Sequence, residues 1–278
     1  MLRLTAIEQG DTHARPGTLR AGLVSITCLL RGLPLFFGTA AATPLRALCI
    51  VALDTIHVLR YARPLSRQRR QELGTLLDFQ ACSNAVWDGK PLDAAEYQRL
   101  RQRLEKAGLG GWITEYLNRL GELETRRPPV GGDRRRFDDV RSYREAVARL
   151  ALATTAAMAM DAESIDDAIR STYCESDLAA LFRMAMQCQI IDDVIDYRED
   201  LSAGLPSFLT ASVSLPQAIA LTADAARSYG PKPRRSVRGG LFPLEAALYV
   251  LTAMTTLVVA VAGKGVVRNL LAADRRRA

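Results

Sequence analysis

The sequence has few histidines and no paired cysteines, and these shortages exclude several classes of protein. The 278 residues contain only two histidines, His13 and His57, which argues against a zinc hydrolase or a zinc ribbon. The five cysteines form no C-x-x-C pair, so we expect free thiols in a reducing compartment, the cytoplasm. The chain also lacks G-x-x-x-x-G-K-[ST], G-x-G-x-x-G and a secretory leader, so neither a nucleotide-binding loop nor secretion is predicted.

An excess of positive charge is confined to two short segments. The chain carries 37 Lys and Arg against 30 Asp and Glu, a formal charge of +7. Arg227–Arg238 and Arg275–Arg277 hold eight basic residues and no acidic ones, and without them the formal charge is −1. Such local basicity indicates contact with a phosphate group or an anionic membrane surface. We therefore expect peripheral membrane contact and no nucleic-acid partner.

The alternation of apolar and polar residues that marks strands is absent, whereas apolar residues recur at helical spacing. We therefore expect an all-α fold in one domain over residues 1–278. It would include an N-terminal extension (1–18), a basic loop (228–240) and a basic tail (272–278). The sequence leaves monomer and homodimer open.

Capping residues and turn residues delimit the expected helices. Ser66 and Asp93 are suited to begin helices, and Gly89 to end one. The expected helical ranges are 19–61 with breaks near 32–34 and 44, 66–88, a helix from 93, 110–124, 138–160, 164–173, 176–200, 214 to about 230, and a last apolar helix after the basic loop. Pro128 to Asp133 is expected to be a turn-rich connection.

The last of these helices contains Ala246–Val261, sixteen residues without a charge, followed by Lys264. A membrane-spanning helix needs about 20 apolar residues, so a buried core helix is the favoured interpretation. A membrane anchor or an interfacial helix is the alternative.

The most informative segment is Gln187–Asp200, which concentrates acidic residues inside an apolar helix. At ~100° per residue, Asp192, Asp196 and Asp200 fall within about 80° of one another on one face. Like charges one turn apart oppose helix formation, and burial increases the cost. A hard divalent ion that takes oxygen ligands relieves this repulsion, so the pattern predicts Mg²⁺, with Mn²⁺ as the alternative. A solvated acidic face without a ligand is the other interpretation.

Parts of this segment resemble known motifs. Gln189–Asp196 resembles the second aspartate-rich motif of polyprenyl diphosphate synthases. Asp196–Asp200, with Gly204 after it, is similar to the D-Y-x-E-D run of squalene and phytoene synthases. Asp138–Ala148 is similar to the helix in which that family has a tyrosine before a V-A-G-like stretch, although Arg149 stands where a glycine is expected.

The resemblance implies the all-α fold of class I isoprenoid synthases, with a central apolar pocket, a Mg²⁺ cluster and a prenyl diphosphate substrate. It implies that three acids bind the metal or orient its waters: Asp192, Asp196 and Asp200. It further implies that Gln189 faces the pocket, that Asp193 corresponds to the second acid of the polyprenyl motif, and that Tyr143 lies near the isoprenoid chain.

Enzymes of this class carry a second acidic motif on a facing helix, and here that motif is degenerate. No D-D-x-x-D occurs in the N-terminal half. One candidate is Asp54 with His57, which follows an apolar run. The other is Asp78 with Asn84 and Asp88, and we prefer it because Asn84 and Asp88 are oxygen ligands one helical turn apart.

Cations near the diphosphate are expected besides the metal. The candidates lie in or beside the basic loop, which is suited to close over the pocket: Arg227, Tyr229, Lys232 and Arg235. A solvated charge run is the alternative interpretation.

These motifs predict an enzyme that ionises a prenyl diphosphate, releases diphosphate, and cyclises or condenses the resulting cation. A head-to-head prenyltransferase like squalene or phytoene synthase is one alternative. A non-catalytic lipid-binding or assembly subunit with the same fold is another.

Overall fold

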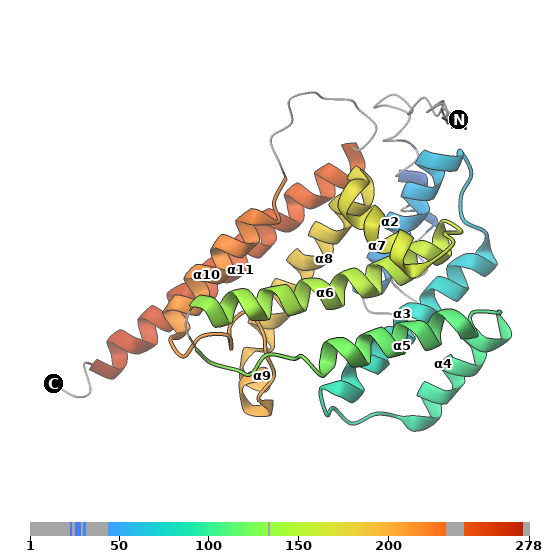
Figure 1. The fold of residues 1–278 in the computed structure, drawn as a ribbon. Coiled ribbons are helices and arrows are strands. Elements are labelled where there is room, and N and C mark those ends of the chain that lie inside the picture. Colours follow the sequence, from blue (N-terminus) through green and yellow to red (C-terminus); the bar gives the residue numbers. More distant parts are fainter. Residues whose placement is uncertain are drawn as a thin grey trace, which may run out of the picture.

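The fold is known from a computed structural model that describes residues 23, 26–28, 30, 31, 44–132, 134–231 and 242–274, with side chains except at 44, 45, 134, 176, 242, 243 and 265–274. Within these ranges every regular element is a helix, so the all-α prediction is confirmed (Figure 1). The helices are α2 (Pro44–Tyr61), α3 (Arg67–Trp87), α4 (Ala94–Lys106), α5 (Gly110–Glu124), α6 (Arg134–Ala159), α7 (Ile165–Cys174), α8 (Ser176–Ile195), α9 (Tyr197–Ala203), α10 (Leu215–Ser228) and α11 (Phe242–Asp274). The N-terminal extension and most of the basic loop and tail lie outside the described residues.

Side-chain caps begin several helices where the sequence predicts them. The Ser66 hydroxyl accepts the N–H of Arg69 at 3.0 Å, and the Asp93 carboxylate accepts the N–H groups of Ala95 and Glu96. Such caps satisfy N–H groups that have no partner within the helix. One start was misplaced, because α6 begins at Arg134 and not at Asp138.

Helix α6 crosses the middle of the bundle and contacts α3, α5, α7 and α8 (Figure 1). Residues 152–159 of α6 are buried without interruption. Six of these eight residues are alanine or threonine with short side chains, and these allow neighbouring helices to approach closely. Thr154 and Thr155 satisfy their hydroxyls on backbone carbonyls one turn earlier. The core therefore surrounds α6, which is packed between its neighbouring helices.

The acidic segment is divided between two helices, so the single helix predicted over 176–200 is wrong. Helix α8 ends at Ile195, Asp196 lies at a bend with φ −90° and ψ 7°, and α9 begins at Tyr197. Gly204 then ends α9 in the left-handed region at φ 67°, which glycine adopts without strain. The bend gives the carboxylates of the acidic segment different surroundings.

The prediction that Ala246–Val261 is a buried core helix is also wrong. One helix in the described residues, over Leu244–Lys264, is long and apolar enough to cross a membrane, yet only 17% of its apolar window is buried. Helix α11 packs on α8 and α10 along one side. Its other side carries exposed apolar residues such as Leu257, which is 64% exposed.

Candidate functional site

The acidic residues at the junction of α8 and α9 differ strongly in exposure. Asp193 and Asp200 are buried, at 2% and 6% exposure, whereas Asp192 is exposed and Asp196 is intermediate. The Asp196 N–H donates to the Asp192 carbonyl at 2.8 Å and the Asp200 N–H to the Asp196 carbonyl at 2.9 Å, so the three acids stay one helical turn apart through the bend although their exposure differs. Two carboxylates point into the protein, and two remain accessible at its surface.

Asp193 is held by an ion pair with Arg144 of α6, whose guanidinium lies 2.8 Å from its carboxylate. The other carboxylate oxygen of Asp193 accepts the N–H of Phe208 at 2.7 Å. Burial raises the pKa of Asp193, and Arg144 and the Phe208 N–H act against that rise. Asp193 therefore joins α8 to α6 and to the loop after α9.

Arg144 is the centre of a larger group of charges. Burial by itself would lower the pKa of Arg144, but the charges of Asp193, Asp200 and Asp88 raise it above its usual value. Asp88 lies at the end of α3, whereas the other two acids belong to α8 and α9. Carboxylates from both predicted acidic motifs thus act electrostatically on one arginine, and Asp193 is in direct contact with it. We call this group of residues the Arg144 cluster.

A chain of hydrogen bonds supports the α3 side of the Arg144 cluster. The guanidinium of Arg127 donates to Asp88 at 2.9 Å and to Glu124 at 2.6 Å. The Tyr143 hydroxyl also donates to Glu124, at 2.9 Å. Burial raises the pKa of Tyr143. The charge of Arg127 lowers this pKa, whereas the charge of Glu124 raises it further. Tyr143, predicted near an isoprenoid chain, has its hydroxyl engaged with Glu124.

The exposed side of the Arg144 cluster combines acids with one lysine. Partial desolvation raises the pKa of Asp192, and the negative charge of Asp196 raises it further. Lys90, in the turn after α3, acts in the opposite direction on both Asp192 and Asp200. The end of α3 and the start of α9 therefore lie at the same end of the bundle (Figure 1). The repulsion of Asp192 by Asp196 is offset only in part, by Arg144 and then by Lys90.

Two amide oxygens in the predicted motifs are buried without a hydrogen-bond partner in the described structure. They are Oδ1 of Asn84, one turn before Asp88, and Oε1 of Gln189, one turn before Asp193. Buried polar atoms normally have partners, and an ion or water is a common reason for an exception. Together with the accessible carboxylates, these oxygens are the donor type that Mg²⁺ takes.

The described residues contain no group of three or more His, Cys, Asp or Glu side chains placed to hold a metal ion. Mg²⁺ commonly binds through one or two carboxylates and completes its shell with water and substrate phosphates. The available donors fit that mode of binding, in which Asp192 and Asp196 would hold the ion only together with a diphosphate.

The remaining residues proposed for the first motif have structural partners. Asp78 forms an ion pair with Arg46 at 2.9 Å. Asp54 is buried and accepts the N–H of Leu65 at 2.7 Å. Nδ1 of His57 lies 2.7 Å from the carbonyl oxygen of Arg63. Asp54 and His57 thus hold the chain between α2 and α3, whereas Asp88 belongs to the Arg144 cluster.

The predicted diphosphate-binding residues are placed elsewhere or not described. Tyr229 is buried, donates to Glu145 at 2.5 Å and accepts from Arg141 at 2.9 Å, so it joins α10 to α6. Arg227 forms an ion pair with Asp224 on the surface of α10. Lys232 and Arg235 lie outside the described residues.

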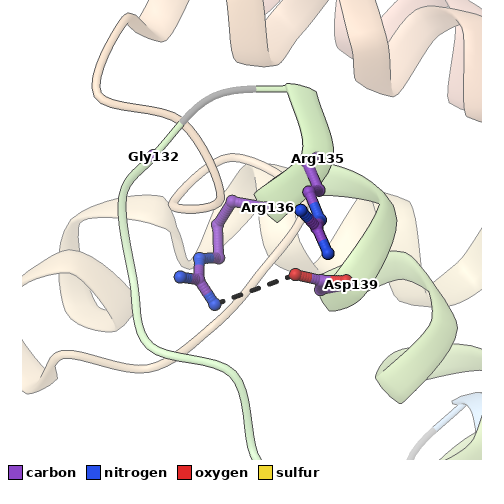
Figure 2. Close-up of a pocket in the computed structure, with 4 residues that line it drawn as sticks. All are labelled: Gly132, Arg135, Arg136 and Asp139. Atoms are coloured by element: carbon purple, nitrogen blue, oxygen red, sulfur yellow. Dashed lines mark ion pairs between the residues drawn. The ribbon is translucent and has the colours of Figure 1, made fainter.

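An open hollow of about 580 Å³ lies at the start of α6, beside the loop that precedes it. It is lined by Gly132, Arg135, Arg136 and Asp139 (Figure 2). Arg136 and Asp139 form an ion pair across it at 3.8 Å, and Arg135 points toward the same carboxylate in this view. None of the residues predicted for the site lines this hollow.

Sequence reasoning missed Arg144 and Lys90. For Arg144 a signal was present, since it lies four residues after Val140 and three before Val147, both of which are buried. A charge on the apolar face of a helix needs an opposite charge nearby, and Asp193 supplies it. Lys90 follows a glycine in a turn, and nothing in the sequence relates it to α8.

Comparisons with protein-family models, with curated proteins and with solved structures find no match for this chain. The relationship to isoprenoid synthases that the motifs predict therefore depends on the residues alone.

Proposed function

We propose that this protein is a Mg²⁺-dependent isoprenoid synthase that ionises a prenyl diphosphate and releases diphosphate. The observation that carries the proposal is the Arg144 cluster, where Asp193 of α8 pairs with Arg144 at 2.8 Å and the charges of Asp200 on α9 and Asp88 after α3 act on the same cation. The degenerate first motif favours a reaction with one substrate, in which the cation is cyclised. Head-to-head condensation of two prenyl chains is the alternative within the same class.

Each part of the Arg144 cluster has a role in this proposal. Asp192 and Asp196 would hold Mg²⁺ together with water and substrate, and the chemistry that the metal would supply there is neutralisation of negative charge on the diphosphate. Lys90 adds a cation to the same exposed side. Arg144 is a positioning residue, since its ion pair fixes Asp193 and lowers the repulsion among the carboxylates.

We further propose that the protein is cytoplasmic and that its basic segments contact a membrane peripherally. It agrees with the five cysteines, which are free thiols.

The test is incubation of the purified protein with C10, C15 and C20 prenyl diphosphates and Mg²⁺. Pyrophosphate release is measured, and the organic extract is analysed by mass spectrometry. A hydrocarbon or alcohol of the substrate's carbon number indicates cyclisation or ionisation of one chain, whereas a doubled carbon number indicates condensation.

Two variants connect the activity to the Arg144 cluster. Asp192→Asn and Asp196→Asn should each lower turnover by at least ~10²-fold, because each removes charge from the metal site. Glu122→Gln, an exposed acid on α5, is the matched control and should keep wild-type turnover. Turnover without loss in both aspartate variants would remove these residues from the mechanism.

Absence of pyrophosphate with all three substrates would refute the enzyme assignment. If thermal stability then still rises with a non-hydrolysable prenyl diphosphate, the non-catalytic lipid-binding subunit replaces it.

A further inference from the structure

Helix α11 has two sides of opposite character. Its inner side carries Leu244, Leu248, Thr255 and Val259, all at most 3% exposed. Its outer side carries five large apolar residues that are 51–64% exposed: Tyr249, Val250, Met254, Leu257 and Val261. At ~100° per residue, these five positions lie within an arc of about 140°. We call them the outer face of α11.

The outer face is apolar for longer than is usual on a surface helix. The run Leu244–Lys264 has a mean hydropathy of 2.0, and residues 246–263 contain no charged side chain. Soluble monomers rarely expose a large continuous apolar patch, and such a patch marks contact with a protein or a membrane. In Figure 1 this helix lies along the edge of the bundle, and its C-terminal part extends beyond the other helices.

The charges at the two ends of the helix indicate which partner covers the outer face. Residues 230–245, which lead into the apolar run, contain four cations and one acid, Glu245. Residues 264–278, from Lys264 to the end of the sequence, contain five cations and one acid. Those two segments hold all of the chain's excess positive charge, because the chain's total is +7. An apolar helix with basic groups at both ends complements a bilayer with anionic headgroups.

The same charges oppose pairing between two copies of the chain through this face. Because both ends of α11 are basic, parallel and antiparallel pairing alike would bring basic segments together, and like charges across an interface are unfavourable. A second copy is therefore the weaker candidate.

The inner side of α11 opposes insertion across the membrane. The amide of Gln187 on α8 donates to the Thr252 hydroxyl at 3.1 Å, and the Thr255 hydroxyl donates to the Gln187 carbonyl at 3.4 Å. Gly263 lies against Ile219 of α10, where an added Cβ would come within 3.3 Å. A helix whose inner side is held to the bundle between Leu244 and Gly263 presents its other side to lipid but does not span.

We propose that the outer face of α11 docks in the plane of an anionic lipid bilayer, with Lys264 at the headgroups. The five apolar side chains enter the boundary between headgroups and acyl chains, to a depth of about 5–10 Å. This inference does not depend on the proposed enzymatic activity.

Flotation of the full chain with vesicles tests the proposal. Vesicles of phosphatidylcholine with about 30% phosphatidylglycerol should bind the protein at least tenfold more strongly than phosphatidylcholine alone, because basic segments are attracted to anionic lipid. Raising NaCl to about 0.5 M should weaken binding to the anionic vesicles. Equal binding to the two vesicle types, or no binding to either, would overturn the proposal.

Substitutions then locate the contact. The double variant Met254→Glu with Leu257→Glu should bind anionic vesicles at least tenfold more weakly, because both side chains would enter the lipid. Val213→Glu is the matched control, since Val213 is 85% exposed and lies outside α11. Its binding should stay within twofold of wild type. Circular dichroism shows whether each variant is folded. Lys264→Glu is the second test variant, which only reverses a surface charge and should also weaken binding to the anionic vesicles.

The alternative partner has its own readout. A dimer seen by light scattering without lipid, and converted to monomer by the double variant, would assign the outer face to a second copy and overturn the lipid proposal.

Discussion

The Arg144 cluster and the outer face of α11 are opposite departures from the usual arrangement of a soluble protein. The Arg144 cluster places charges inside, where each acid needs a partner, and Asp193 has its partner at 2.8 Å. The outer face places apolar groups outside, where Leu257 is 64% exposed. Charge in the interior and apolar surface at the exterior both cost stability, so each is expected where the molecule binds something.

The two regions also differ in how they tolerate change. A buried ion pair is costly to break on one side, because the remaining charge is left without a partner. A side chain that already contacts water loses little when it is shortened. Stability measurements on matched variants therefore separate the two regions, and the largest effect is expected at Arg144.

Arg144→Met should lower the free energy of unfolding by about 3–5 kcal/mol, because it leaves the Asp193 carboxylate buried without its ion pair. Denaturant unfolding at pH 8 measures the change. The control is Arg170→Met, which removes a surface ion pair with Asp167 and should cost less than about 1 kcal/mol. Similar losses in the two variants would mean that the Arg144 cluster is as solvated as the surface.

A second pair of variants compares the two sides of α11. Leu248→Ala should cost about 2–5 kcal/mol, because Leu248 is fully buried and its removal leaves a cavity. Leu257→Ala, on the outer face of the same helix, should change stability by less than about 0.5 kcal/mol. Thermal and denaturant unfolding in the absence of lipid measure both. A large loss in Leu257→Ala would show that the outer face is covered in solution.

The smallest effect compares two tyrosines, one in each region. Tyr143→Phe removes the hydroxyl that donates to the buried Glu124 and should cost about 1–2 kcal/mol. Tyr249→Phe removes a hydroxyl from a side chain that is 63% exposed on α11 and should be close to neutral. Chemical denaturation measures both changes. A larger loss of stability in Tyr249→Phe than in Tyr143→Phe would contradict the contrast between a buried polar network and an exposed apolar surface.

Most of the helices could be predicted from sequence because their signals are local. Ser66 and Asp93 cap the helices that they were expected to begin, and α5 has the predicted bounds of 110 and 124. A capping side chain acts within one turn of the chain, so its effect needs no knowledge of the rest of the protein.

The candidate site could be predicted only in part. The acidic motif and the choice of Asn84 and Asp88 over Asp54 followed from ligand chemistry and helical spacing. The bend at Asp196 was not predicted, and neither were the inward position of Asp193 and the role of Arg144, which depend on a contact between residues about fifty positions apart. Tyr229 has the same explanation, since Glu145 and Arg141 engage it from another helix.

The sequence by itself determined that this protein is helical, that its acids gather near the end of one helix, and that its last helix is apolar. These properties follow from periodicity and composition along the chain. Only the tertiary structure decided which acids are paired and which remain accessible, and which side of α11 is covered. Periodicity fixes which residues share a face of a helix, but the packing of distant segments decides what that face meets.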